Sequence, residues 1–342
     1  MYDVAIVGAG VLGAALACEA KALGLKAVVV APKGQSPSFL AGRWFRLNTW
    51  TGADQHPRLE AAIRPADRSR FPVASTLPLA AEALLKRAKV PRVDTEVLKL
   101  RRLTGPEAGV ELLGALRDVR ARAAVLCLGW GPARGLPRGA LAFSTALRRF
   151  VLGEMKGRVI GVVGAGPSAL SFLEACVGLA PGKVAPLRDG QFVTWLQGTR
   201  TPKSPPGVKK MFDARYGPLF RALKKDPRVT AVPRRVERTY LGGGRWRLRD
   251  DAGDDHFVDE LVWCAGFEPP LQLLTRGARG TRPLRRDGVK LALQRVGAGG
   301  PEPVFQVGPA LDQLGFASWD TGPYAEWFEK GRRVLTMLRD AR

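Results

Sequence analysis

The stretch YDVAIVGAGVLG, residues 2–13, decides the fold, because a short apolar run ends there in a glycine-rich turn. An alanine-rich helical stretch follows to about residue 23, and a second apolar run covers residues 26–30. A strand, a G-x-G-x-x-G turn and a helix open the β-α-β unit that binds a dinucleotide. Its glycines let the backbone turn tightly and approach a pyrophosphate, which the helix N-terminus stabilises.

The same plan occurs a second time. Residues 158–163 form an apolar run, GAGPSA follows at 164–169, and a helical stretch leads to another apolar run at 192–196. Turn glycines rarely repeat with the same flanks by chance, so the pair predicts two dinucleotide sites. The expected phosphate-binding residues are Gly8, Gly10, Val11, Leu12 and Gly13 in the first turn, and Gly164, Gly166, Pro167, Ser168 and Ala169 in the second.

Shorter patterns complete both halves. The apolar runs 123–128, 261–264 and 304–307 are each followed within two residues by a glycine, and a helix is expected over about 322–339. Strands at 92–100 and 109–116 predict one small β-meander, and strands at 229–237 and 245–249 predict another. The two halves therefore share one organisation.

Composition sets the class of protein. With 342 residues, 46% hydrophobic and 25% charged, the chain is expected to make two globular domains. The net charge of +23 comes from basic residues spread along the whole chain and alternating with acids. We therefore expect a solvated basic surface and no nucleic-acid partner, and leave open an acidic protein partner. No run reaches the roughly 18 apolar residues of a membrane span, so we expect a cytoplasmic protein without a membrane partner or targeting segment.

The cysteines exclude one kind of redox chemistry. The chain has four cysteines, far apart and among apolar residues, and no C-x-x-C pair. A close-spaced redox dithiol is therefore excluded, and with only two histidines no metal site is expected. We expect four buried thiols.

Taken together, these features resemble the two-dinucleotide-binding-domain flavoproteins, the superfamily of thioredoxin reductases, glutathione-reductase-like enzymes, flavin-containing monooxygenases and N-hydroxylating monooxygenases. GAGVLG resembles the FAD loop and GAGPSA the NAD(P)H loop; CLGWGP and CAGFEP resemble the two following strand ends, and VGPALD the flavin-contacting turn. The resemblance implies an α/β fold of two Rossmann-like, three-layer ββα domains, the second inserted into the first. The FAD domain would comprise residues 1–152 and 265–342, and the NAD(P)H domain residues 153–264.

The resemblance implies FAD and NADPH as cofactors. Ala31 stands where the family has a ribose-binding glutamate, and Pro309 where it has an aspartate. After the run 192–196 no acid is available for a ribose hydroxyl, whereas two cations can meet a 2′-phosphate, so NADPH is favoured over NADH. The cofactor residues expected outside the two turns are Lys33, Arg43, Trp44, Gly129, Arg200, Lys203, Gly266, Gly308 and Asp312.

A flavin and a nicotinamide in one chain imply hydride transfer. By resemblance, residues 39–50 and 315–322 would line the flavin ring, which makes Asn48, Trp319 and Asp320 the candidate catalytic residues. The monooxygenase signature would place a histidine at Phe143.

Three functions stay open. The first is an NADPH-dependent monooxygenase that forms a hydroperoxyflavin and oxygenates a small molecule. The second is a flavin reductase that passes electrons to a disulfide, quinone or protein acceptor, and the third is a non-catalytic nucleotide-binding protein. The monooxygenase is the interpretation we favour.

Overall fold

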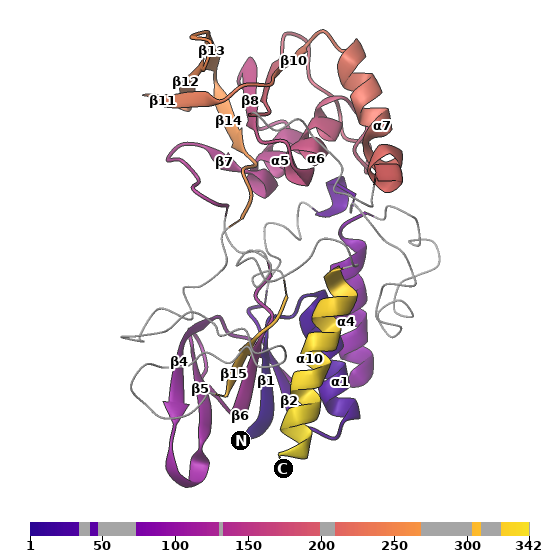
Figure 1. The fold of residues 1–342 in the computed structure, drawn as a ribbon, viewed down its shortest axis with the longest axis vertical. Helices are drawn as coiled ribbons and strands as arrows, with labels where there is room; N and C mark the ends of the chain where they lie inside the picture. Colours follow the sequence, from indigo (N-terminus) through magenta and orange to yellow (C-terminus); the bar gives the residue numbers. More distant parts are fainter. Residues whose placement is uncertain are drawn as a thin grey trace.

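The computed structural model describes residues 1–33, 42–46, 73–129, 133–198, 209–267, 303–308 and 323–341 (Figure 1). β1 lies inside the first of its sheets. The strand order is β3-β2-β1-β6-β5-β4, and β15 pairs with β6. β1, β2, β3, β6 and β15 run parallel, whereas β4 and β5 form an antiparallel meander on β6. The strands are β1 (Tyr2–Val7), β2 (Ala27–Val30), β3 (Arg92–Val93), β4 (Val97–Leu103), β5 (Gly109–Gly114), β6 (Val119–Leu126) and β15 (Val304–Gln306).

Three helices cover one face of this sheet: α1 (Val11–Ala22), α4 (Thr76–Ala88) and α10 (Pro323–Asp340). α1 contacts both of the others, which explains why its alanine-rich sequence is apolar around most of its circumference. α10 approaches α1 closely at Gly331, where a Cβ atom would lie only 2.5 Å from Cδ1 of Leu16. This sheet and its helices are called the first unit below.

The second unit is built on a parallel sheet of order β10-β9-β8-β14-β7. Its strands are β7 (Leu141–Ala142), β8 (Val159–Val163), β9 (Phe192–Leu196), β10 (Val229–Val232) and β14 (Glu260–Trp263), and its helices are α5 (Phe143–Val151), α6 (Pro167–Cys176) and α7 (Lys209–Lys225). The other face is covered by an antiparallel sheet of β11 (Val236–Gly242), β12 (Arg245–Asp250) and β13 (Asp255–Val258). Trp246 and Leu248 of β12 pack there against Leu196 and Leu261.

The topology confirms the expected fold class. Helices, parallel sheet and meander make three layers in the second unit, and the chain leaves the first sheet after β6 and returns to it at β15. The two connections meet between the units: the Arg134 N–H donates to the Gly266 carbonyl at 2.9 Å, and Ala133 forms an antiparallel bridge with Phe267. Figure 1 shows both ends of the chain at the far end of the first unit.

Two expected boundaries differ from the structure. Residues 141–151 were assigned to the first domain, but β7 pairs with β14, and Phe143, Leu147 and Phe150 of α5 lie in the helix-side core of the second unit. The expected strand 229–237 is two strands: Val229–Val232 joins the parallel sheet, and the meander begins only at Val236. Pro233, which has no N–H to donate, separates the two.

Candidate functional site

The first glycine turn connects β1 to α1. Gly8 has φ +108°, its N–H donates to the Val30 carbonyl at 2.9 Å, and a Cβ there would run into the carbonyl oxygen of Cys127. A Cβ on Gly13 would likewise run into the carbonyl oxygen of Gly8, so the helix packs directly on the turn. Among the residues that the structure describes, a Cβ on Gly10 would, in contrast, meet nothing within 4 Å. In the described part of the chain the turn is therefore closed toward Cys127 and open in front of the helix.

The second turn, between β8 and α6, repeats this arrangement. Gly164 has φ +121°, its N–H donates to the Leu196 carbonyl at 2.9 Å, and a Cβ there would run into the carbonyl oxygen of Cys264. A Cβ on Gly166 would meet none of the described residues within 4 Å. Ala169, which takes the place of the third glycine, is fully buried. Both turns predicted from the sequence thus have the same backbone geometry.

Both helices begin without a side-chain cap. α1 starts after Gly10 and α6 after Gly166, no capping side-chain hydrogen bond is made at either, and neither first turn holds an acid. The first N–H groups of a helix have no partner within the helix, and the helix dipole favours an anion there. Because the described residues leave space in front of Gly10 and Gly166, each turn fits a pyrophosphate bound by backbone N–H groups.

Three further glycines lie at the carboxyl ends of parallel strands. Gly129 follows β6, Gly266 follows β14 and Gly308 follows β15. A Cβ on Gly308 would come within 3.0 Å of Cδ2 of Leu12, which places the end of β15 against the start of α1. The end of β15 and the first turn therefore lie side by side, and their sharing one cofactor site stays a prediction.

An acidic side chain from a neighbouring strand lies close to the end of β2, where the family has a glutamate and this chain has Ala31. Ala31 is buried in the helix-side core, and the next polar group is the exposed Lys33. The backbone N–H of Lys33 donates to the carboxylate of Asp94, which follows β3. A carboxylate from the next strand thus lies at the end of β2.

Arg43 and Trp44, expected at the flavin, lie in a short segment of the first half that packs on the second unit. Trp44 and Phe45 pack against the helix-side core of that unit, and the Phe45 ring meets the Phe143 ring edge-on at 5.4 Å. Arg43 stacks on Trp44, with its guanidinium carbon 5.2 Å from the ring centroid. Contact of these residues with a flavin stays a prediction.

A buried ion pair holds the same segment. Arg215 of α7 makes a two-point contact with Glu174 of α6, one arm of which, Nη2 to Oε2, is 2.7 Å long. Arg215 Nη2 also donates to the Arg46 carbonyl at 3.3 Å. The side chains of Arg215 and Glu174 are only 3% and 6% exposed, so this link between residue 46 and the second unit is shielded from water.

The remaining predicted site residues lie outside the described parts of the chain. They are Asn48, Arg200, Lys203, Asp312, Trp319 and Asp320. Their assigned roles stay predictions.

The four cysteines are confirmed as buried thiols, and none of them forms a disulfide. Burial raises the pKa of Cys127 and of Cys264, so both stay protonated at neutral pH. Cys127 follows β6 and Cys264 follows β14. They support the backbone of the two turns and are not available as thiolates.

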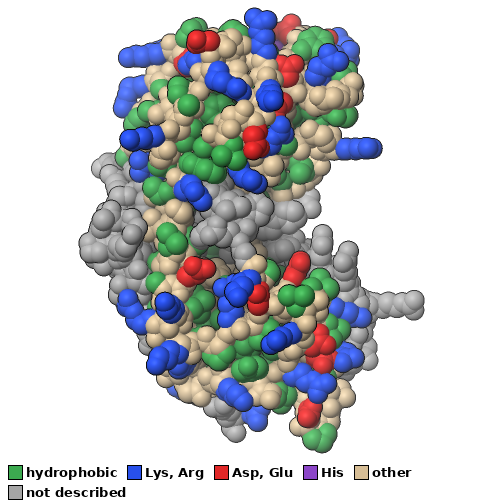
Figure 2. Space-filling view, turned by 180° about the vertical axis from the view of Figure 1, so that it is seen from behind, with side chains coloured by type: hydrophobic (Ala, Val, Ile, Leu, Met, Phe, Trp, Pro, Cys, Tyr) green, Lys and Arg blue, Asp and Glu red, His purple; other side chains and the backbone are tan. Residues whose placement is uncertain are grey.

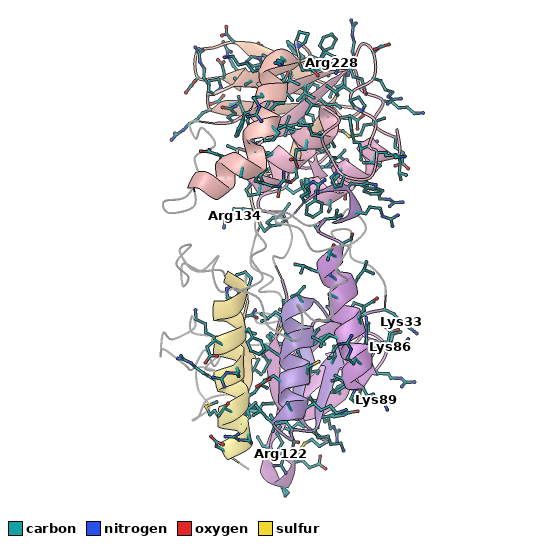
Figure 3. All side chains as sticks on the ribbon, turned by 90° about the vertical axis from the view of Figure 1, so that its right-hand side faces the viewer. Lys33, Lys86, Lys89, Arg122, Arg134 and Arg228 are labelled. Atoms are coloured by element: carbon teal, nitrogen blue, oxygen red, sulfur yellow. The ribbon has the colours of Figure 1, made fainter. Side chains whose placement is uncertain are left out.

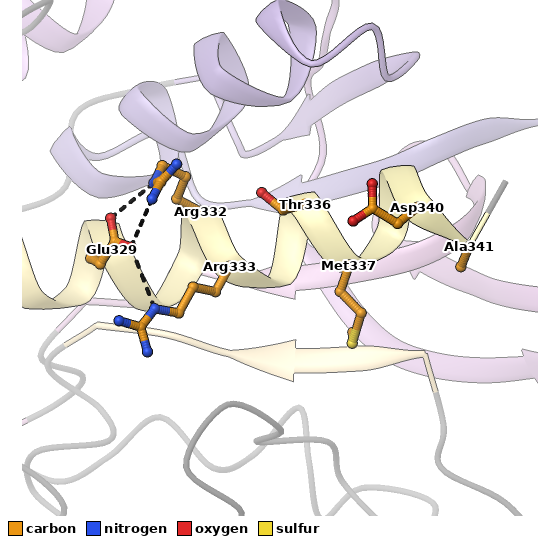
Figure 4. A pocket seen from close by; sticks show the side chains of 7 residues that line it. All are labelled: Glu329, Arg332, Arg333, Thr336, Met337, Asp340 and Ala341. Carbon is orange, nitrogen blue, oxygen red and sulfur yellow. Dashed lines mark hydrogen bonds and ion pairs between the residues drawn. The ribbon is translucent and has the colours of Figure 1, made fainter.

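A surface hollow of about 800 Å³ lies away from the two glycine turns, along α10, where Glu329 contacts Arg332 at 2.9 Å through two hydrogen bonds and Arg333 at 3.4 Å (Figure 4). Figure 2 shows lysine and arginine side chains scattered over both units, with acids between them. Of the helices in the described ranges, none combines the length and apolar character needed to cross a membrane.

Compared by sequence, the chain matches no family model and no curated protein. Compared by structure, it is similar to an FAD-bound cadaverine monooxygenase of desferrioxamine biosynthesis from Erwinia amylovora, with a TM-score of 0.72, 16% identity, and 100% of this chain and 95% of that chain covered. An L-lysine 6-monooxygenase from Pseudomonas syringae superposes with a TM-score of 0.70 at 16% identity over both whole chains. Thioredoxin reductase from Lactococcus lactis gives 0.68 at 10% identity, again over both whole chains. The chain therefore has the fold of the two-dinucleotide-binding-domain flavoproteins.

Proposed function

We propose that this protein is an NADPH-dependent FAD oxidoreductase, and that it is a monooxygenase acting on a small molecule. The observation that carries the proposal is the pair of glycine turns with matching hydrogen bonds and the same open space before the helix. The fold neighbours support it, because they include flavin monooxygenases and disulfide reductases. Bound together, the two cofactors would supply hydride transfer from nicotinamide to flavin and onward electron transfer.

The chain's own residues would bind and orient these groups. The backbone at Gly10 and the first N–H groups of α1 would hold the FAD pyrophosphate, with Gly308 beside them at the end of β15. Gly166 and the start of α6 would hold NADPH. The indole N–H of Trp195 donates to the Gly164 carbonyl at 2.8 Å, which fixes the second turn in its open form.

The buried cysteines favour the monooxygenase over a disulfide relay. A thiol relay needs an accessible thiolate, and all four cysteines of the chain are buried. Electrons would therefore leave the flavin for oxygen or for an acceptor that reaches it directly. A reductase serving an anionic protein acceptor is the second candidate, and the basic surface supports it.

The proposal is tested first by the absorption spectrum of the purified chain. We expect bound flavin, or flavin binding after FAD is added, whereas a colourless protein that does not bind FAD would refute the proposal. Two variants separate the sites: Gly10→Glu should abolish flavin binding and keep NADPH binding. Gly166→Glu should keep the flavin and abolish its reduction by NADPH. Because each variant is the control for the other, equal effects in both assays would reject the assignment of the two turns.

Oxygenation is distinguished from reduction by readmitting air to the NADPH-reduced protein in a stopped-flow instrument. A monooxygenase should reoxidise through a separate, resolved spectral phase. A single reoxidation step with prompt release of peroxide would instead support the reductase.

A further inference from the structure

The carboxyl ends of β1, β2 and β3 stand level with one another. Val7 pairs with Val30, and Val30 pairs with Val93. The next residues along the three strands are therefore neighbours: Gly8 of the phosphate turn, Ala31 and Asp94. The Ala31 N–H donates to the Val93 carbonyl at 3.1 Å, which continues the pairing past the end of β2.

In the described part of the chain, no acidic side chain follows β2 directly. In dinucleotide sites an acid about 20 residues after the glycine turn accepts a hydrogen bond from the ribose hydroxyl. Here Ala31 is apolar and 6% exposed. The Pro32 carbonyl is already used, because it accepts a hydrogen bond of 2.8 Å from Nη2 of Arg92.

Asp94 reaches across to this place from β3. Adjacent strands lie about 4.8 Å apart. The Asp94 carboxylate spans that gap, since it accepts the backbone N–H of Lys33, two residues beyond Ala31. A carboxylate offers about four lone-pair sites, and the Lys33 N–H occupies one. The side chain is half-buried, so it is held by the fold and can still reach a ligand.

We propose that Asp94 replaces the missing β2 acid and accepts a hydrogen bond from the adenosine ribose of the dinucleotide at the first turn. The inference rests on the proposed function, in which that dinucleotide is FAD. It also predicts a ribose with free hydroxyls, because a carboxylate repels a 2′-phosphate. Figure 3 shows Lys33 on the same side of the first unit as Lys86 and Lys89. If these cations bound a 2′-phosphate, a nucleotide with a 2′-phosphate would compete better than one with a free ribose.

The test is a titration of the flavin-free full chain with FAD, followed by flavin fluorescence. Asp94→Asn keeps the size of the side chain and an oxygen for the Lys33 N–H but removes the charge. We expect FAD affinity to fall about 10- to 100-fold, because a charge-assisted hydrogen bond is lost. The matched control is Asp118→Asn, whose carboxylate accepts the Gly114 N–H at 3.0 Å at the turn between β5 and β6. It should bind FAD like the unmodified protein.

A competition experiment distinguishes the ribose from a 2′-phosphate. 5′-AMP should displace FAD from the unmodified protein better than 2′,5′-ADP, which differs from it only by the 2′-phosphate, and this preference should shrink in Asp94→Asn. Stronger displacement by 2′,5′-ADP, or equal FAD affinity of Asp94→Asn and Asp118→Asn, would overturn the inference and leave the proposed function standing. Failure of the unmodified chain to bind FAD would overturn the proposed function itself.

Discussion

Replacing Arg215 by methionine should destabilise the second unit severely, because it leaves the buried carboxyl group of Glu174 without its charged partner. The two side chains are 3% and 6% exposed, and each is held by the other. Removing one partner of such a buried pair typically costs about 3 to 5 kcal/mol of the free energy of unfolding. A single domain has only about 5 to 15 kcal/mol in total, so much of the stability of this unit would be lost.

The measurement is urea unfolding followed by tryptophan fluorescence and circular dichroism. With a urea m-value of about 2 kcal/mol per M, the loss should lower the midpoint of the transition that involves the second unit by about 2 M. The double variant Glu174→Leu/Arg215→Met should recover most of the loss, because an apolar pair of similar volume leaves no buried charge. The control is Glu329→Ala in the ion pair on α10, which is 41% and 47% exposed and should cost less than about 1 kcal/mol.

Two results would refute this reasoning. One is a loss below about 1 kcal/mol in Arg215→Met, which would mean that water or a rearrangement compensates Glu174. The other is a double variant whose loss of stability equals the sum of the losses in Arg215→Met and in Glu174→Leu alone, because groups in direct contact should show coupling.

Three further predictions concern the folded state. Gly331→Ala should destabilise the protein by about 1 to 3 kcal/mol, because the new methyl group would overlap the fully buried Leu16; this outweighs the better helix propensity of alanine. Thermal unfolding should show that the double variant Gly331→Ala/Leu16→Ala loses less stability than the sum of the two single variants. Hydrogen bonds from Arg120 and Arg101 outweigh burial and lower the pKa of Glu111 below its ordinary value of 4.5. This carboxylate therefore stabilises the folded state at a pH above 4.5, and the stabilisation is lost as the pH falls through the lowered pKa. Urea unfolding between about pH 6 and pH 3 should therefore show a smaller acid loss in Glu111→Gln, and parallel pH profiles would contradict this. The four cysteines should react with a thiol reagent only after denaturant is added, and rapid labelling of the native protein would show that their burial is wrong.

The sequence predicted what is encoded locally. A G-x-G-x-x-G turn constrains its own backbone, so both glycine turns could be placed without any knowledge of the rest of the chain. The sequence does not predict α5 or α7: Phe143 stands at a signature position of the monooxygenases, and Pro218 inside α7 argues against a helix. The apolar faces of both helices are buried in one core that forms only when the second unit folds.

The sequence could not predict contacts that depend on pairing between distant segments. Asp94 and Lys33 are 61 residues apart, and only the register of β3 on β2 brings them together. Arg46 and Arg215 are 169 residues apart and meet across the two units. No sequence pattern around Asp94, a single aspartate after the two-residue strand β3, predicts its contact with Lys33.

The second unit occupies the connection between two parallel strands of the first sheet. β6 and β15 are parallel neighbours in the first sheet. Parallel neighbours cannot be joined by a hairpin, and the chain must travel back along the sheet through a crossover of a dozen or more residues. Here that obligatory crossover contains the entire second unit, whose exit and return meet at Arg134 and Gly266. Because the ends of the insert touch, such a unit can be gained or exchanged during evolution as one block without rewiring the sheet that hosts it.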